Sequence, residues 1–429
     1  MHRKHPQPKT YSWFIILSAS LFFFYSHIEL NIFNAINIPI RHAFHITATT
    51  SSALSSFTLL STLIFIPFAG VLIDRYSPKK IIIYTLSFSI FGTLLLAINH
   101  YLLIAFFARF LCGIGSAFCF ISILKIATYW FPQKKLGWVT GILVTIATCG
   151  GLVAQKPAAI LIQQINWRNT LLVTAALGML ILLWIYHHVK DSPAETKPPS
   201  QLISNCTLSQ LLTVYTNPSY WKKGLYTSSL NLPFWILGAS WGIPYLVQTR
   251  HCTLSMAASI TSLLYIGIMI GSPCFARFAD AINNTKIPMI LGSICTTLAL
   301  GLIIYAHTNI PTLSLLFFML GFSSGAQILT YSLVLNSAPQ KIKASSTSVI
   351  SFITLGGGFL SQIIFGTLLD LGKTMFHTNQ YNNTCYLLAL TILPICSFLS
   401  FIITLNIKHK NPTTPLSHSQ NQSEHPPLY

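Results

Sequence analysis

The stretch GVLIDRYSPKK, Gly70–Lys80, places one acid and three bases in a chain that otherwise avoids charge. Of the 429 residues, 52% are hydrophobic and 7% are charged, whereas about 25% of the residues of a soluble domain are charged. Long apolar segments lie directly before and after this stretch. The pattern indicates a short charged connection between two membrane-spanning helices.

Twelve apolar segments along the chain are each long enough to cross a hydrocarbon core of about 30 Å as a helix. The first is too long for the core of a signal peptide and lacks a small-residue cleavage pattern, so we expect it to be retained. We predict an all-α membrane protein whose helices, numbered 1 to 12 in this order, span 12–38, 50–73, 80–98, 101–128, 137–163, 168–189, 223–248, 256–279, 286–307, 311–336, 345–371 and 384–406.

The sequence holds 25 Lys and Arg against 7 Asp and Glu, a net charge of +18. Basic residues near the ends of membrane spans set topology more often than they bind nucleic acid. With the N-terminus in the cytoplasm, the other side receives four bases and the spans hold four more: Arg41, Arg168, Arg250 and Lys373, then Arg109, Lys125, Lys156 and Arg277. The remaining seventeen are cytoplasmic. We expect a multi-pass protein of the bacterial inner membrane, with both termini cytoplasmic and no nucleic acid partner.

Landmarks recur at a nearly constant offset of 206 to 208 residues, which indicates an internal duplication. Asp74 matches Asp280, and the glycine cluster that begins at Gly113 matches the one at Gly321. We predict two pseudo-symmetric six-helix bundles, 12–189 and 223–406, with a cytoplasmic loop 190–222 between them and cytoplasmic tails 1–11 and 407–429. Parallel repeats of this kind favour a transporter whose site lies between the halves.

No metal-binding or nucleotide-binding motif is present in the sequence. The patterns HExxH and GxxxxGK[ST] are missing, and the nine cysteines form no CxxC pair. We therefore expect no catalytic residue, no metal and no cofactor.

The opening stretch resembles the loop motif of the major facilitator superfamily, G-x-L-x-D-R-x-G-R-K-[KR]. Ser77 and Pro78 depart from that motif, and the matching positions are Gly70, Leu72, Asp74, Arg75, Lys79 and Lys80. The segment ARFLCGIGSA is similar to the family's R-x-x-x-G-x-G pattern in helix 4, with Arg109, Gly113 and Gly115. The segments WGIPYL and GGGFLSQIIFGTLLD are similar to bacterial solute carriers, including nutrient transporters of intracellular pathogens.

This resemblance implies a secondary transporter that works by alternating access, with a small-molecule solute and a proton or other coupling ion as partners. It also implies that Asp74 contacts the start of helix 11, near Ala344–Thr347, and that Asp280 holds the corresponding place in the second half. Arg109 would take part in coupling or gating, although a structural link is an equal alternative.

Helix 1 carries the only acid that lies well within an apolar span, Glu29. Ionisable groups inside a membrane are costly, so Glu29 is our candidate for proton coupling; proximity to the membrane surface is the alternative. His27 is about 200° around the helix from Glu29, so the two side chains face different ways. His27 shares its face with Asn31 and Asn34, and either face is a candidate for the pathway.

Further candidates for the pathway are spread over helices 5, 7, 10 and 11. Lys156 is suited to a substrate carboxylate, with snorkelling to the surface as the alternative. Pro233 and Pro244 are expected to loosen helix 7 and free carbonyls near a site. Convergent amide and aromatic groups suit a small ligand, although packing is the alternative for each aromatic ring: Asn231, Trp235, Trp241, Tyr245, Gln327, Tyr331 and Gln362.

A glycine and proline motif in helix 5 bears on the direction of transport. Antiporters of this family carry G-P-x-x-G-G there, whereas this chain has Gly150 and Gly151 without the preceding proline. We therefore predict proton-coupled import, or symport, of a small polar nutrient such as an amino acid or organic acid by a monomer. Efflux of metabolites or drugs is the second candidate, and a non-transporting membrane receptor is the third.

Overall fold

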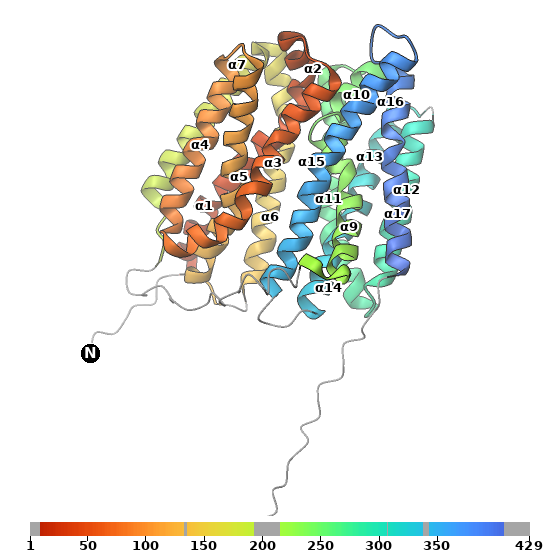
Figure 1. Ribbon diagram of the computed structural model, residues 1–429. Coiled ribbons are helices and arrows are strands. Elements are labelled where there is room, and N and C mark those ends of the chain that lie inside the picture. Colours follow the sequence, from red (N-terminus) through yellow and green to blue (C-terminus); the bar gives the residue numbers. More distant parts are fainter. Residues whose placement is uncertain (1–8, 133–134, 193–214, 307, 338–342, 407–429) are drawn as a thin grey trace, which may run out of the picture.

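The computed structural model describes residues 9–132, 135–192, 215–306, 308–337 and 343–406, and every regular element among them is helical. Two bundles stand side by side, one red to yellow and one green to blue (Figure 1). The first bundle consists of α1 (Lys9–Asn31), α2 (Phe33–Phe44), α3 (Ala48–Arg75), α4 (Pro78–Ile98), α5 (Leu102–Trp130), α6 (Leu136–Val153) and α7 (Lys156–His188).

The second bundle repeats the arrangement with more breaks in its helices. It consists of α9 (Pro218–Pro233), the π-helix η2 (Phe234–Gly238), α10 (Gly242–Thr249), α11 (Leu254–Ala281), α12 (Lys286–Tyr305), α13 (Ile310–Ser324), the 3-10 turn η3 (Gly325–Ile328), α14 (Leu329–Ser337), α15 (Lys343–Met375), α16 (Asn383–Leu390) and α17 (Ile392–Leu405).

The structure contains the twelve predicted crossings when one bent helix pair is counted as a single crossing and one merged segment is divided at its break. Ten helical segments are long and apolar enough to span a membrane, and the bent pair Pro218–Gly238 and Gly242–Thr249 makes an eleventh. The segment Leu136–His188 has 53 residues, far more than the roughly 20 that one span needs. Asn166, with φ 66°, divides it into two crossings, which makes twelve.

Several helix boundaries differ from the predicted spans because local capping decides them. Helix 1, the first crossing, consists of α1 and α2 and extends to Phe44, where His45 adopts a left-handed conformation (φ 52°). Helix 7, the seventh crossing, consists of α9, η2 and α10 and is not α7; it begins at Pro218 rather than at residue 223, because the Asn217 side chain accepts a hydrogen bond from the Ser219 amide. Apolarity alone carries no information about such caps.

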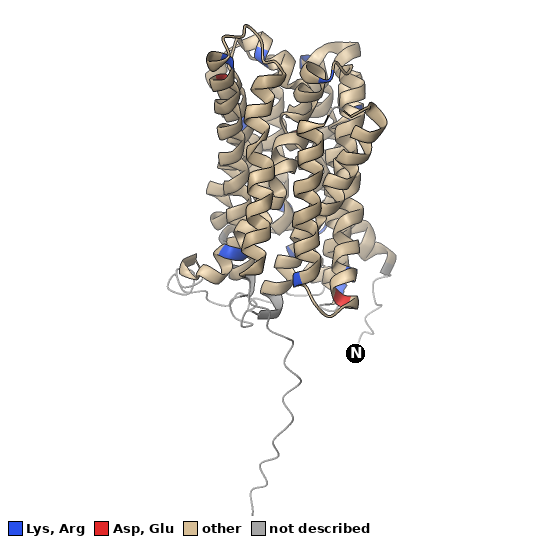
Figure 2. Ribbon diagram, turned by 90° about the vertical axis from the view of Figure 1, so that its right-hand side faces the viewer, with Lys and Arg blue, Asp and Glu red and all other residues tan. Residues whose placement is uncertain are grey.

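An even number of crossings leaves both ends of the described chain on one side of the bundle. That side holds Arg75, Lys79 and Lys80 in the connection between α3 and α4, and we call it the basic side. Charged residues gather at the two ends of the molecule, and the long middle is almost free of them (Figure 2).

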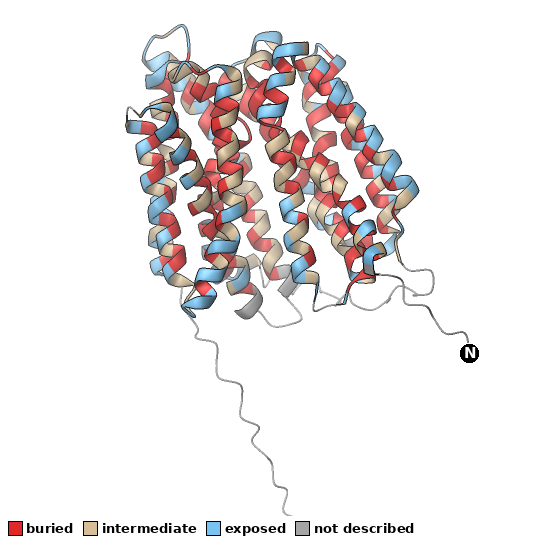
Figure 3. Ribbon diagram, turned by 180° about the vertical axis from the view of Figure 1, so that it is seen from behind, coloured by how far each residue is buried: buried red, intermediate tan, exposed pale blue. Residues whose placement is uncertain are grey.

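The outer surface of the bundle is apolar. Exposed residues lie on the outside of the helices and buried ones face inward (Figure 3). Leu103, Tyr101 and Trp138 are 81%, 72% and 68% exposed. Large apolar side chains are exposed all around the bundle, which suits the hydrocarbon core of a membrane. In that environment helices satisfy their own backbone hydrogen bonds.

The internal duplication has a counterpart in the packing of small residues. A Cβ at Gly113 would lie 2.4 Å from the Thr58 carbonyl oxygen, and one at Gly321 would lie 2.0 Å from that of Leu264. Thr58 and Leu264 are again 206 positions apart. Glycines therefore bring α5 onto α3 and α13 onto α11 in the same way.

Replacing Gly113 by leucine is expected to destabilise the protein by about 1–3 kcal/mol, because the added side chain forces α5 away from α3. The measurement is the apparent melting temperature of the purified protein in detergent. Gly141→Leu is the matched control, since a Cβ at Gly141 meets no heavy atom within 4 Å. Equal melting temperatures for the two variants would contradict this account of the packing.

Candidate functional site

The helix 7 segment breaks where the sequence places proline. Pro233 ends α9, the next five residues form the π-helix η2, and α9 with η2 is bent by 57° from α10. Pro244 lies in the first turn of α10, where proline is tolerated. The break frees main-chain oxygens from regular helical pairing, as the prolines predicted.

Asparagines of helix 1 satisfy these freed oxygens from the other bundle. The Asn34 amide donates to the oxygens of Leu237 (3.1 Å) and Gly238 (2.8 Å), and its own oxygen accepts from the Ile243 amide (2.9 Å). Asn37 donates to the Ser240 oxygen at 2.8 Å. Backbone groups left unpaired in a membrane interior are costly, so these bonds hold the two bundles together.

Gln155, which the sequence prediction did not select, lies at the centre of this contact. It is fully buried at the break between α6 and α7. Its oxygen accepts from Asn34 (2.9 Å) and Thr261 (3.1 Å), and its amide donates to the Gly238 oxygen (3.1 Å) and Tyr265 (3.2 Å). The sequence feature that indicates Gln155 is an amide within an apolar span, directly before Lys156.

A small hollow lies between the bundles, next to this network. Its volume is about 120 Å³, and its lining comes from both halves: His27, Thr148, Asn231, Phe234, Tyr265, Ile268 and Gln327. Asn231 donates to the Gln327 oxygen, and Tyr265 donates to the Asn31 side chain at 2.7 Å. Three predicted pathway residues, His27, Asn231 and Gln327, are thus brought together, and the His27 face of helix 1 is the one that lines the hollow.

Glu29 faces the interior of the first bundle instead. The Glu29 side chain is 2% exposed, its Oε1 accepts from Thr93 at 2.5 Å, and its Oε2 has no partner. Arg109 lies close by and donates to the main-chain oxygens of Glu29 (2.9 Å) and Ser55 (3.2 Å). Carbonyl oxygens therefore surround the buried guanidinium, and the Phe33 ring lies 5.3 Å from it.

The other predicted pathway residues do not line the hollow. Trp235 is buried with its indole nitrogen unpartnered, and its main-chain oxygen accepts from Gln362 at 3.0 Å. Trp241 donates to Ser52 at 2.8 Å, across the two bundles. Tyr245 donates to the Ile303 oxygen at 3.0 Å, Tyr331 pairs with Ser351 at 3.3 Å, and Lys156 is exposed.

The charged loop motif is held within its own bundle. Ser77, one of its two departures, donates to Asp191 and caps α4, while the Lys79 amide donates to Asp191 at 2.7 Å. Among the described residues, a Cβ at Gly70 would meet no heavy atom within 4 Å. The Asp74 side chain and those of residues 343–345 lie outside the described part, so their contact stays a prediction. In the second half, Asp280 is exposed.

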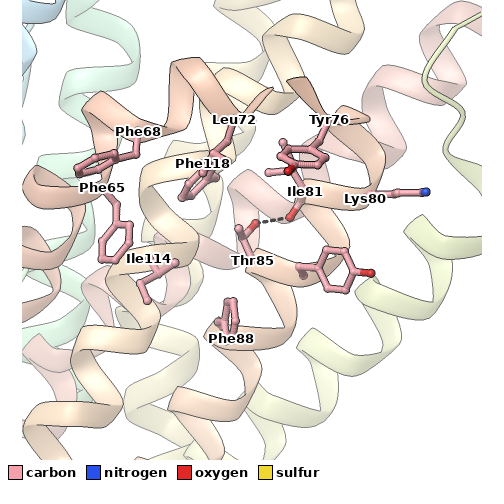
Figure 4. A pocket seen from close by; sticks show the side chains of 11 residues that line it. Phe65, Phe68, Leu72, Tyr76, Lys80, Ile81, Thr85, Phe88, Ile114 and Phe118 are labelled. Carbon is pink, nitrogen blue, oxygen red and sulfur yellow. Dashed lines mark hydrogen bonds between the residues drawn. The ribbon is translucent and has the colours of Figure 1, made fainter. Parts of the chain in front are cut away.

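A larger hollow of about 720 Å³ lies on the outside of the first bundle, between α3, α4 and α5. Phenylalanine and aliphatic side chains cover its wall, and the Lys80 amine points away from them (Figure 4). The Thr85 hydroxyl donates to the Ile81 oxygen at 2.8 Å. Because one bundle supplies the whole lining, rocking of the two halves cannot expose this hollow to each side in turn. The hollow between the bundles is therefore our candidate site.

Comparison with known proteins agrees with this architecture. The chain is 24% identical to the uncharacterized transporter YybO of Bacillus subtilis over 80% of this chain and 85% of that protein. It is also 24% identical to a D-galactonate transporter of Escherichia coli O6:H1, over 77% and 82%. A bacterial homolog of the human lysosomal transporter Spinster, solved in an inward-facing and unoccupied conformation, has the same fold with a TM-score of 0.74, 16% identity and coverage of 95% and 100%.

The family model of the Major Facilitator Superfamily matches residues 14–362, which is most of the chain. Its span includes the charged loop motif, the glycine contacts of α5 and the broken helix 7. Together with the two six-helix bundles, this match shows that the chain is a membrane transporter that belongs to the Major Facilitator Superfamily.

Proposed function

We propose that this transporter imports a small polar solute with a carboxylate, such as an amino acid or an organic acid, together with protons. The observation that carries the proposal is the hollow between the bundles, in which His27, Asn231 and Gln327 converge beside an aromatic wall. Its volume of about 120 Å³ is well below the roughly 300–1,000 Å³ of sites for drug-sized ligands, which favours a small solute.

The charge of the hollow supports a solute that binds by hydrogen bonds rather than by a fixed ion pair. None of its seven lining side chains carries a fixed charge, and His27 supplies the one imidazole among them. The amides of Asn231 and Gln327 offer both donors and acceptors. The relative named as a D-galactonate transporter takes, by its name, a sugar acid, which also favours a hydroxylated or amino carboxylate.

The orientation of the molecule follows from its charges under this proposal. The basic side faces the cytoplasm of a bacterial cell, because Arg and Lys are retained on that side of a membrane. Both termini are then cytoplasmic, and the protein is a monomer in the inner membrane. The hydrogen bonds of Asn34, Asn37 and Gln155 close the site toward the outside, so the structure corresponds to the inward-facing half of the cycle.

Glu29 is the proposed proton carrier. It is a buried acid with one unpartnered oxygen, and no described cation donates to its carboxylate. It lies two residues from His27 on the same helix, so a shift of helix 1 on solute binding moves both groups. Such a link lets the proton and the solute each bias the same conformational balance.

Solute binding is tested by a thermal-stability screen of the purified protein against amino acids, hydroxy acids and nucleosides. A binding solute raises the apparent melting temperature by mass action. Asn231→Ala and Gln327→Ala are each expected to weaken binding of that solute by roughly fivefold, the effect of about one hydrogen bond. Thr145→Ala on the exposed face of α6 is the control and leaves binding unchanged. Binding that is indifferent to both amides would place the site elsewhere.

Proton coupling is tested in vesicles with an imposed pH gradient. Uptake of the identified solute is expected to rise several-fold when the outside is acidic, and Glu29→Gln is expected to remove this dependence while exchange of solute without a gradient continues. Glu195→Gln, a second acid-to-amide change at a position between the two bundles in the sequence, serves as the control and retains the response. Uptake that ignores the gradient in the wild type, with Glu29→Gln fully active, would exclude the mechanism.

A further inference from the structure

The same five-residue pattern, G-x-L-x-D, occurs at two ends of one helix pair. It appears as GVLID, residues Gly70–Asp74 in α3, and as GTLLD, residues Gly366–Asp370 in α15. Glycine and aspartate are four residues apart in both copies and lie on one face of the helix. The second copy is not the duplicate of the first, since the duplicated position of Asp74 is Asp280.

The helices α3 and α15 run side by side in opposite directions between the two bundles (Figure 1). Ser52 near the start of α3 meets Gly366, and Leu59 further along packs in one cluster with Leu355 and Phe359. Their antiparallel course places the Gly70–Asp74 copy on the basic side and the Gly366–Asp370 copy on the opposite side. Each copy lies at the end of the helix pair where the partner helix begins.

In the Gly366–Asp370 copy, glycine permits a close approach. A Cβ at Gly366 would lie 2.4 Å from the Ser52 hydroxyl and 2.6 Å from the Ala48 main-chain oxygen. No side chain fits at that separation without moving the partner's backbone. One turn later along α15, Asp370 therefore stands directly over the start of α3.

The Asp370 carboxylate caps the first turn of α3 from the other bundle. Its Oδ2 accepts from the Thr49 amide (2.8 Å) and hydroxyl (2.6 Å), and its Oδ1 accepts from the Ala48 amide (3.1 Å) and the Tyr381 hydroxyl (2.5 Å). Amides of the first helical turn have no partner within their own helix and favour an anion. Four donors on one carboxylate, two of them from the helix backbone, make this a strong contact between the bundles.

The tyrosine that donates to this carboxylate is itself packed against a cation. The Arg41 guanidinium lies 4.3 Å from the centre of the Tyr381 ring and 5.5 Å from that of Trp241. Burial and the adjacent Asp370 carboxylate raise the pKa of Tyr381 to about 12. The Tyr381 hydroxyl therefore keeps the proton that it donates to Asp370.

The glycine of the Gly70–Asp74 copy has different surroundings from Gly366. Among the described residues, no heavy atom outside its own helix lies within 4 Å of a Cβ placed at Gly70, whereas the equivalent position at Gly366 is crowded. One copy is thus engaged with its partner helix, and no described part of the partner helix approaches the glycine of the other copy. Two halves that rock about a central site close one end of this helix pair as they open the other.

We infer that Asp370 is a positioning residue that latches the side opposite the basic side, and that it acts as the reciprocal counterpart of Asp74. The Gly366–Asp370 copy engages α3 when that side is closed, and the Gly70–Asp74 copy engages α15 when the basic side is closed. Each acid stabilises one conformation only, so neutralising it shifts the balance toward the other. The inference uses alternating access alone and is independent of the proposed solute and ion.

The test is hydrogen–deuterium exchange, read by mass spectrometry, on the full-length protein in lipid nanodiscs. Asp370→Asn is expected to open the closed side: exchange rises in residues 33–55 and 366–386 and falls in residues 65–80. We expect the ratio of the two conformations to change by at least about tenfold, which corresponds to about 1.4 kcal/mol. Adding Asp74→Asn to Asp370→Asn is expected to return both regions toward the wild-type pattern.

Two further variants keep the test decisive. Tyr381→Phe removes one donor but keeps the ring beneath Arg41, so it gives a smaller shift in the same direction even if Asp370→Asn fails to fold. Glu424→Gln, an acid-to-amide change in the last residues of the chain, leaves exchange as in the wild type.

Three results would overturn the inference. Unchanged exchange on the closed side in Asp370→Asn or Tyr381→Phe would show that the contact does not hold the gate. Faster exchange at both ends of α3 would show a loss of packing rather than a shift between states. Failure of Asp74→Asn to reverse the effect of Asp370→Asn would remove the reciprocity.

Discussion

The arrangement depends on one constraint: a main-chain carbonyl inside a membrane needs a donor, and a broken helix releases several. In this protein the break after Pro233 releases oxygens at Leu237, Gly238 and Ser240, and Asn34 and Asn37 of the other bundle satisfy them. The bonds form only while the two bundles are closed at this level. The main-chain oxygens that the break in helix 7 leaves unpaired are thus satisfied by contacts between the bundles, and these contacts depend on the conformation of the transporter.

Each of the four acids whose side chains are described has a distinct place. Asp191 caps α4 within the first bundle, Asp370 caps α3 across the two bundles, Glu29 is buried between α1, α4 and α5, and Asp280 is exposed. Because the chain has few carboxylates, few of them compete for the same basic group or helix end. Each contact between a carboxylate and a helix terminus is therefore specific, and a single neutralisation is enough to test its role.

Much of the fold could be predicted from the sequence, because the length and apolarity of a span are local properties. The twelve crossings, the two bundles and the break in helix 7 follow from apolar runs, a constant repeat offset and the position of Pro233. The exact ends of the helices did not follow, since Asn217 and His45 set them through capping and a left-handed turn. The candidate site was predicted only in part: His27, Asn231 and Gln327 meet in the hollow, whereas Lys156 is exposed.

The sequence by itself determined that this is a membrane protein of two related bundles and that few charged residues enter its interior. Composition and periodicity are sufficient for that, because the bilayer penalises every unpaired polar group in the same way. Only the tertiary structure decided which face of helix 1 lines the hollow, that Gln155 joins the two bundles, and that Asp370 reaches α3. Those partners are 83 to 322 positions apart in the chain, and no local pattern encodes which distant helix end a side chain will meet.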